Sequence, residues 1–172
     1  EFPRADEQTL WDGMREAARL GLPVAVHAED EAMTRRLSAA HGGTGARDLL
    51  ASRPVAAELE AIARVLDIAG RTGAKLHIVH VSSGSGVAMA AEARARGIDV
   101  SVETCPHYLL FTDQELERIG VVAKCVPPLR DADEQARLWC ELLDERVDIV
   151  ASDHSPSDPT LKKEGDFRTS WG

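Results

Sequence analysis

The chain has 172 residues, of which 44% are hydrophobic and 28% charged, and its formal net charge is −9 at pH 7. This composition is typical of a folded domain with a buried core and excludes a disordered chain. The acidic balance argues against a nucleic-acid or anionic-membrane partner, and no segment reaches the roughly 18 apolar residues needed to cross a bilayer.

Helical and strand-like segments alternate along the chain. The strand-like segments are short, rich in β-branched residues and apolar without clean alternation, which is typical of strands covered on both faces. Gly21 and Gly97 end two of the helical segments, and Asp131 can cap the start of another. In chain order we expect a helix at 7–20, a strand at 24–26, a helix at 54–69, a strand at 76–81, a helix at 86–96, a strand at 98–102, a helix at 131–143 and a strand at 147–151.

This alternation predicts an α/β fold with a parallel sheet and right-handed crossovers. Both a doubly wound sheet and a TIM barrel fit the order of elements. No GxGxxG follows the first strand, which disfavours a dinucleotide-binding domain. Four strands in about 150 residues are about half of an eight-stranded barrel.

Three of the predicted strands end on side chains that can bind a metal. Residues 24–26 run into His27, residues 76–79 into His80, and residues 148–152 into Asp153. In parallel α/β folds the carboxyl ends of the strands meet at one edge, where active sites are built. Any one histidine could be an ordinary packed side chain, but the three together indicate a site for zinc or a similar divalent metal.

Other titratable residues give weaker signals. His77 lies three positions before His80 in the same strand, so we expect it on the opposite face, packed against a flanking helix. Glu29 and Asp30 are expected to begin the next helix, where carboxylates favour the positive end of the dipole. His107 could orient a ligand or contact substrate.

Several familiar motifs are absent from the sequence. It contains no GxSxG elbow, no HExxH and no Walker motif, which disfavours a serine hydrolase of the Ser–His–Asp type. The three cysteines, Cys105, Cys125 and Cys140, form no CxxC pair. A zinc site built from cysteines is therefore not expected. We expect the three cysteines to be reduced thiols in a cytoplasmic protein.

Five segments together carry a resemblance to a known family. They are VAVHAED (24–30), LHIVHVSSGSGV (76–87), VETCPHYL (102–109), KCVPPLRD (124–131) and IVASDHSP (149–156). In this order they resemble the cyclic amidohydrolases, which include allantoinases, dihydropyrimidinases (hydantoinases) and dihydroorotases. The combination of CPHYL, CVPPLRD and SDHSP is most similar to the allantoinase branch.

The resemblance implies a TIM-barrel hydrolase with a binuclear divalent metal centre at the C-terminal mouth of the barrel. His27, His80 and Asp153 match the ligands on the fifth, sixth and eighth strands. The family's first-strand His-x-His pair and its carboxylated lysine have no counterpart here, so we expect them in an N-terminal part that precedes this chain. Residues 1–172 are thus expected to form the second half of the barrel. Zinc is the expected metal, and cobalt, manganese, nickel or iron would accept the same ligands.

The resemblance also implies an activity, the metal-dependent hydrolysis of a small cyclic amide. The expected reaction is the opening of allantoin to allantoate in purine breakdown, with Asp153 as the catalytic proton carrier. Cys125, Val126, Pro127 and His107 are the expected substrate-binding residues. A cytoplasmic homotetramer without nucleic-acid or membrane partners is expected, and this segment alone is expected to be inactive. The alternatives are dihydropyrimidinase or dihydroorotase activity, or a structural relative that has lost its metals, although the presence of all three ligands argues against the last.

Overall fold

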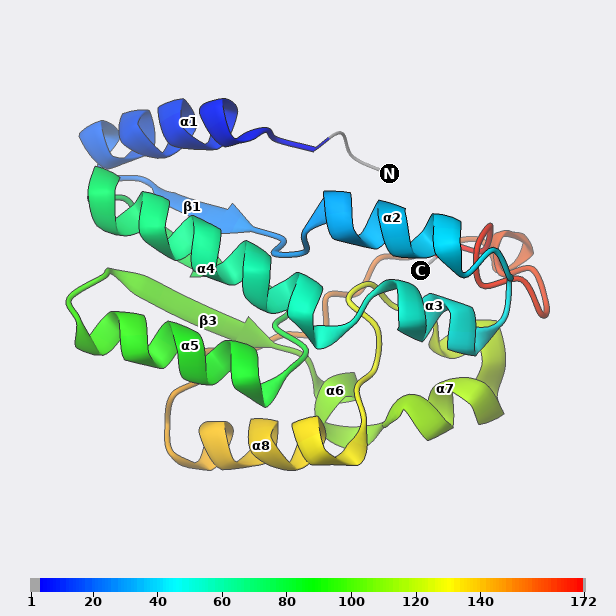
Figure 1. Cartoon of the computed structure of the whole chain (residues 1–172). Helices are drawn as coiled ribbons and strands as arrows, with labels where there is room; N and C mark the ends of the chain where they lie inside the picture. The colour runs from blue at the N-terminus through cyan, green and yellow to red at the C-terminus, as the bar shows by residue number, and fades with distance from the viewer. Residues whose placement is uncertain (1–3, 172) are drawn as a thin grey trace.

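The computed structural model describes residues 4–171, so residues 1–3 and 172 of the expected domain lie outside the described part. The elements alternate along the chain much as predicted (Figure 1). The strands are β1 (Pro23–Val26), β2 (Lys75–Ile78), β3 (Val100–Thr104) and β4 (Ile149–Val150). The helices are α1 (Glu7–Leu20), α2 (Glu31–Ala40), α3 (Ala46–Ser52), α4 (Val55–Thr72), α5 (Gly84–Ala95), α6 (Pro106–Leu110), α7 (Asp113–Ile119) and α8 (Ala132–Leu143), with 3-10 turns η1 (Gly120–Ala123) and η2 (Pro159–Leu161).

The described strands form one parallel sheet in the order β1-β2-β3-β4. Leu76 of β2 pairs with Val24 on one side and Val100 on the other. A doubly wound sheet reverses its strand order at a switch point, whereas a barrel adds each strand beside the last. The order therefore confirms the barrel-like alternative for this segment, with consecutive strands as neighbours.

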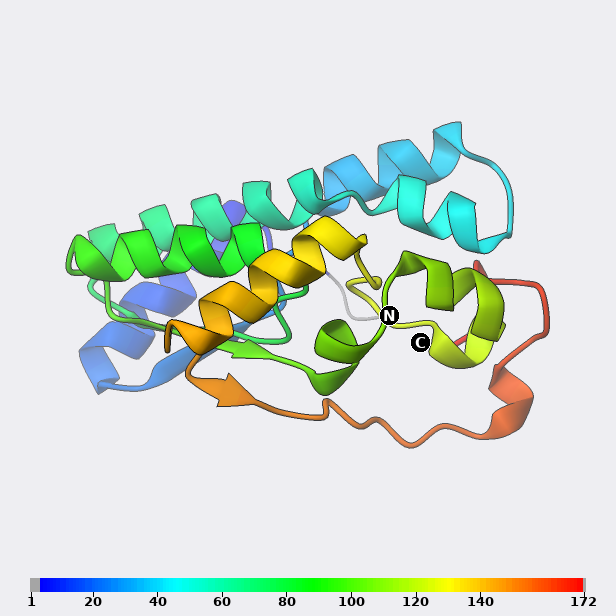
Figure 2. The same ribbon diagram turned by 90° about the horizontal axis from the view of Figure 1, so that it is seen from below.

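Helices α4, α5 and α8 cover one face of the sheet (Figure 2). Leu76 and Ile78 of β2 point into this layer and are almost fully buried, as is Ile62 of α4. Burying each such side chain contributes about 1.5–3 kcal/mol. The apolar faces of α4 and α5 thus hold the sheet from one side, and the core lies between these two layers.

Local sequence signals explain where the long helices begin and end. Asp6 and Asp131 cap α1 and α8, each accepting a hydrogen bond from a backbone N–H three residues later. Gly21 ends α1 with a φ of 69°, in the left-handed region that glycine adopts without steric cost. These helices begin and end within three residues of the predicted positions.

The structure adds helices that we did not predict and shortens two predicted strands. The unpredicted helices are α3, α6 and α7; with α2, whose start near Asp30 was expected, they lie in the connections, and Figure 1 shows them gathered where the arrowheads of β1 and β3 point. The predicted strand at 76–81 ends at Ile78, because the chain turns at His80, whose φ is 39°. The predicted strand at 147–151 is reduced to Ile149–Val150.

Among residues 4–171, no helix combines the length and apolar character that crossing a membrane requires.

Candidate functional site

His27 and His80 face each other at the carboxyl ends of β1 and β2. Their side-chain nitrogens, Nδ1 of His27 and Nε2 of His80, are 3.0 Å apart, and the two rings meet edge to face. Because β1 and β2 pair in parallel, the residues that follow the two strands are carried to the same edge of the sheet. The prediction that these two strand ends bring their imidazoles together is confirmed.

The spacing of these nitrogens fits a shared metal ion. Zinc binds histidine nitrogen at about 2.0–2.1 Å, so two such ligands at angles of about 90–110° lie roughly 2.9–3.4 Å apart. The observed 3.0 Å lies within this range. Burial lowers the pKa of His80, and the neighbouring His27 lowers it further, while the charge of Asp153 acts in the opposite direction. A neutral imidazole is the form that ligates metals.

Asp153 lies beyond β4, close enough for its charge to act on His80 and on His107. In the described part of the chain, no hydrogen bond or ion pair joins its carboxylate to either of them. Its φ is 48°, and positive φ in non-glycine residues concentrates at functional sites. Within residues 4–171, no three His, Cys, Asp or Glu side chains are gathered closely enough to hold a metal ion. The three-residue ligand set therefore stays a prediction.

Glu29 contacts His27 on the side away from His80. Its Oε2 is 3.0 Å from His27 Nε2 and also accepts a hydrogen bond of 2.5 Å from Arg53 Nη1. Burial by itself would raise the pKa of Glu29, but the hydrogen bond with His27 and the charge of Arg53 outweigh it and lower the pKa. Only Asp30 of this acidic pair caps α2, by accepting from Met33 N. The prediction that Glu29 merely begins the helix is wrong.

A second buried carboxylate, Glu58 of α4, lies beneath the loop that follows His80. It accepts hydrogen bonds from the backbone N–H and hydroxyl of Ser82 and from the hydroxyl of Ser83. Arg130 donates to the same Ser82 hydroxyl through Nε and to the carbonyl of Arg53 through Nη1. This network fixes the loop after β2 to the segment 124–131.

Sequence reasoning missed the role of Glu58, although a signal was present. Glu58 shares a helical face with Ile62, Val65 and Ala69, all of which are buried. A carboxylate within an apolar face at helical spacing indicates a buried charge with hydrogen-bonding partners.

The predicted substrate loop lies beside this network. Pro127 and Val126 are joined by a cis peptide bond, and the Pro127 carbonyl accepts a hydrogen bond of 2.7 Å from the buried Tyr108 hydroxyl. Burial raises the pKa of the Cys125 thiol to about 11, so this side chain stays protonated near neutral pH. The contacts anchor the loop's backbone, and the substrate-binding role of Cys125, Val126 and Pro127 stays a prediction.

His107 and Cys105 lie at the end of β3. Burial lowers the pKa of His107, and the charge of Asp153 opposes that effect. The Nε2 atom of His107 is buried and has no hydrogen-bond partner in the described part of the chain. Burial raises the pKa of Cys105 to about 12, which makes this thiol unreactive as a nucleophile. His107 Nε2 is thus a buried polar atom without a partner in the described part of the chain, and the substrate-binding role of His107 stays a prediction.

His77 corrects another expectation. We predicted that it packs against a flanking helix, but Leu76 and Ile78 fill that face. His77 lies on the opposite face, where its Nδ1 is 2.8 Å from the Ser101 hydroxyl and its Nε2 is 3.4 Å from a Glu103 oxygen. The side chains of β2 do alternate between the two faces of the sheet, but the helices cover the face of Leu76 and Ile78 and not the face of His77.

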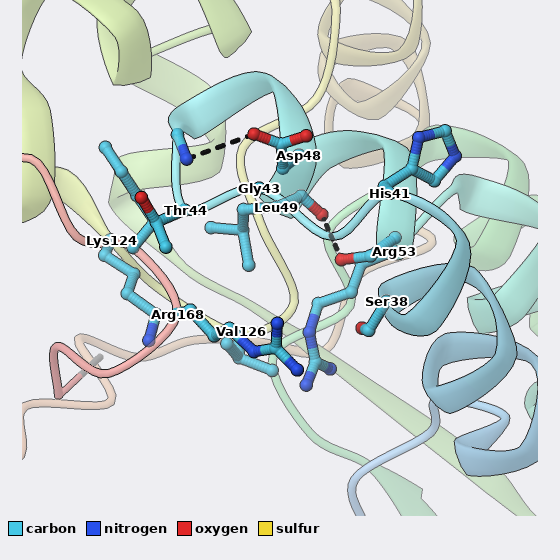
Figure 3. Close-up of a pocket in the computed structure, with 13 residues that line it drawn as sticks. Ser38, His41, Gly43, Thr44, Asp48, Leu49, Arg53, Lys124, Val126 and Arg168 are labelled. Atoms are coloured by element: carbon cyan, nitrogen blue, oxygen red, sulfur yellow. Dashed lines mark hydrogen bonds between the residues drawn. The ribbon is translucent and has the colours of Figure 1, made fainter.

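A pocket of about 160 Å³ adjoins the predicted substrate loop (Figure 3). Arg53, Arg168, Lys124 and Val126 line it, but neither His27 nor His80 does. Arg53 therefore borders both the pocket and the carboxylate that contacts His27.

No model of a known protein family matches the chain. Individual proteins do match it along its whole length. It is 59% identical to an allantoinase of Solibacter usitatus (strain Ellin6076) and 55% identical to an allantoinase of Deinococcus radiodurans, covering 38% and 39% of their lengths. The chain thus spans about two fifths of the curated relatives it matches.

Solved structures give the same result for the fold. The L-hydantoinase (dihydropyrimidinase) from Arthrobacter aurescens matches 94% of the chain with a TM-score of 0.91 and 35% identity, over 36% of its own length. A D-hydantoinase structure matches 97% of the chain with a TM-score of 0.89 and 33% identity, over 38% of its own length. In sequence and in fold, the chain is thus similar to one part, about two fifths, of these allantoinases and hydantoinases.

Proposed function

We propose that the complete protein is a metal-dependent cyclic amidohydrolase that opens allantoin to allantoate. The observation that carries this proposal is the pair of imidazole nitrogens 3.0 Å apart at adjacent strand ends. Identity of 59% to an allantoinase supports allantoin as the substrate. A cytoplasmic homotetramer acting in purine breakdown is part of the same proposal.

The residues of this chain would supply part of a binuclear centre. Nδ1 of His27 and Nε2 of His80 would hold one divalent metal, and Asp153 would add a carboxylate ligand. Zinc is the proposed metal, because imidazole nitrogens are among its preferred ligands. A metal bound there lowers the pKa of a bound water and polarises an amide carbonyl. The Asp153 carboxylate would accept a proton from the attacking water and deliver it to the leaving ring nitrogen. The anchored backbone of residues 124–130 would orient the substrate ring.

A second candidate activity is the hydrolysis of hydantoins or dihydropyrimidines. It is favoured by the hydantoinase structures, whose fold this segment shares with a TM-score of 0.91. Fold and metal ligands do not separate these activities, because the substrate is selected by the surrounding loops.

A substrate panel tests the proposal. We expect the complete protein to open allantoin in preference to hydantoin, dihydrouracil and dihydroorotate, and to lose this activity when a chelator removes the metal. We expect Asp153→Asn to lower kcat by about 100-fold or more with the fold retained, because the proton carrier is removed.

Asp158→Asn is the matched control, since Asp158 lies in the same segment and hydrogen-bonds to Thr160. It should keep the wild-type kcat. Preference for another ring would transfer the proposal to that substrate. Retention of most of the activity by Asp153→Asn would exclude Asp153 as the proton carrier, and absence of turnover on every ring would refute the enzymatic function.

A further inference from the structure

We propose that Glu29 is a positioning residue that selects the tautomer and orientation of His27, with Arg53 holding the carboxylate in place. The inference rests on the proposed function, because it assigns Glu29 a role toward the metal that His27 would bind. Glu29 itself touches neither substrate nor metal in this proposal.

The hydrogen-bond geometry carries the first step. Oε2 of Glu29 lies 3.0 Å from Nε2 of His27, and the same oxygen accepts from Arg53 Nη1. Since a guanidinium only donates, this oxygen acts as an acceptor, and His27 must therefore present an N–H at Nε2. A neutral imidazole protonated at Nε2 has its lone pair on Nδ1. That is the nitrogen that faces His80.

The burial of Glu29 carries the second step. Its side chain is only 3% exposed, whereas that of His27 is 44% exposed. A buried carboxylate thus holds the Nε2 edge of an exposed imidazole, while the Nδ1 edge faces His80. Histidines that ligate metals commonly donate their other N–H to a carboxylate in this way.

Arg53 connects this pair to the rest of the site. Its carbonyl accepts a hydrogen bond from Arg130, and Arg130 also donates to Ser82, two residues after His80. His80 lacks an equivalent partner, because its Nδ1 is buried without a hydrogen bond in the described part of the chain. Within residues 4–171, His27 is thus the member of the pair whose ring is fixed by a carboxylate.

The test compares Glu29→Ala and Glu29→Gln with wild type in the complete protein. The readouts are Zn²⁺ affinity, measured by competition with a chelator, and the visible spectrum of the Co²⁺-substituted protein. We expect Glu29→Ala to weaken Zn²⁺ binding by about 10–100-fold and to change the Co²⁺ spectrum. Glu29→Gln keeps an acceptor oxygen for His27 and should restore part of the affinity.

Asp30→Asn is the matched control. Asp30 is the adjacent buried carboxylate and also pairs with an arginine, Arg64, at 2.9 Å, but it contacts no histidine. It should keep wild-type Zn²⁺ affinity within about twofold, since Asn also caps a helix.

The outcomes separate this inference from the proposed function. Wild-type metal affinity in both Glu29 variants, or equal losses in Asp30→Asn, would overturn the positioning role. Failure of the wild-type protein to bind Zn²⁺ would overturn it as well. If the expected affinity changes occur in a protein that does not open allantoin, the positioning role stands and the proposed substrate fails.

Discussion

Single buried carboxylates do more in this chain than their sequence neighbourhoods indicate. Glu58 is 1% exposed and accepts from three donors on Ser82 and Ser83. A buried charge is tolerated only where such donors compensate for its lost hydration. Glu29 is held in the same manner by Arg53 and His27. At the scale of single residues, two buried carboxylates therefore hold the surroundings of the imidazoles: Glu29 contacts His27, and Glu58 contacts the loop after His80.

Removing the Glu58 carboxylate should strongly destabilise the protein. We expect Glu58→Ala to lower the free energy of unfolding by about 3–5 kcal/mol, because it leaves buried donors unpaired. Urea unfolding of the complete protein measures this. Glu60→Ala, on the exposed side of the same helix, should change the free energy by no more than about 0.5 kcal/mol. Equal effects of the two substitutions would contradict this account.

Helix α5 approaches α8 through a residue that has no side chain. A Cβ atom at Gly84 would lie 2.4 Å from the Cβ of Arg137 and from the backbone nitrogen of Leu138. The two helices are also joined where Ser85 donates to Glu134 from its hydroxyl and its backbone N–H. At the scale of elements, the spacing of these helices is thus set by glycine at the first position of α5.

Gly84→Ala should force the two helices apart. We expect it to lower the free energy of unfolding by about 1–3 kcal/mol through overpacking. Gly13→Ala is the control, because a Cβ at Gly13 in α1 meets no atom within 4 Å. That variant should stabilise the protein by roughly 0.5–1 kcal/mol. Thermal or urea unfolding of both variants checks the difference, and destabilisation by both would contradict the steric explanation.

The described part of the chain leaves both edges and one face of its sheet uncovered. β1 and β4 each have a neighbouring strand on only one side, and Ile149 and Val150 of β4 are exposed. The face of the sheet that carries His77 has no covering helix layer among residues 4–171 (Figure 2). Parallel strands are normally covered on both faces. At the scale of the molecule, the remaining part of the protein is expected to supply this cover.

The 172-residue chain by itself should be inactive. We expect it neither to bind two metal ions tightly nor to open allantoin, because the sequence has no His-x-His pair and presents only part of the family's ligand set. Metal analysis after dialysis and a ring-opening assay measure this, with the complete protein as the positive control. Near-stoichiometric binding of two metals together with turnover would refute the prediction.

The sequence by itself determined the long helices, the parallel orientation of the strands and the convergence of His27 and His80, whereas the order of the strands was left open between a doubly wound sheet and a barrel. These follow from periodicity, capping residues and the rule that parallel strands end at one edge, all of which are local or topological. The short helices α3, α6 and α7 escaped prediction, because helices of one or two turns depend on tertiary packing for their stability.

Only the tertiary structure decided which carboxylate serves which partner. Glu29 and Asp30 are adjacent and chemically alike, yet one contacts His27 and the other caps α2. His77 likewise faces Ser101 and Glu103 because the helices cover the opposite face of the sheet. Such choices depend on contacts between residues distant in the chain. No local pattern contains them, since each depends on which element packs against which face.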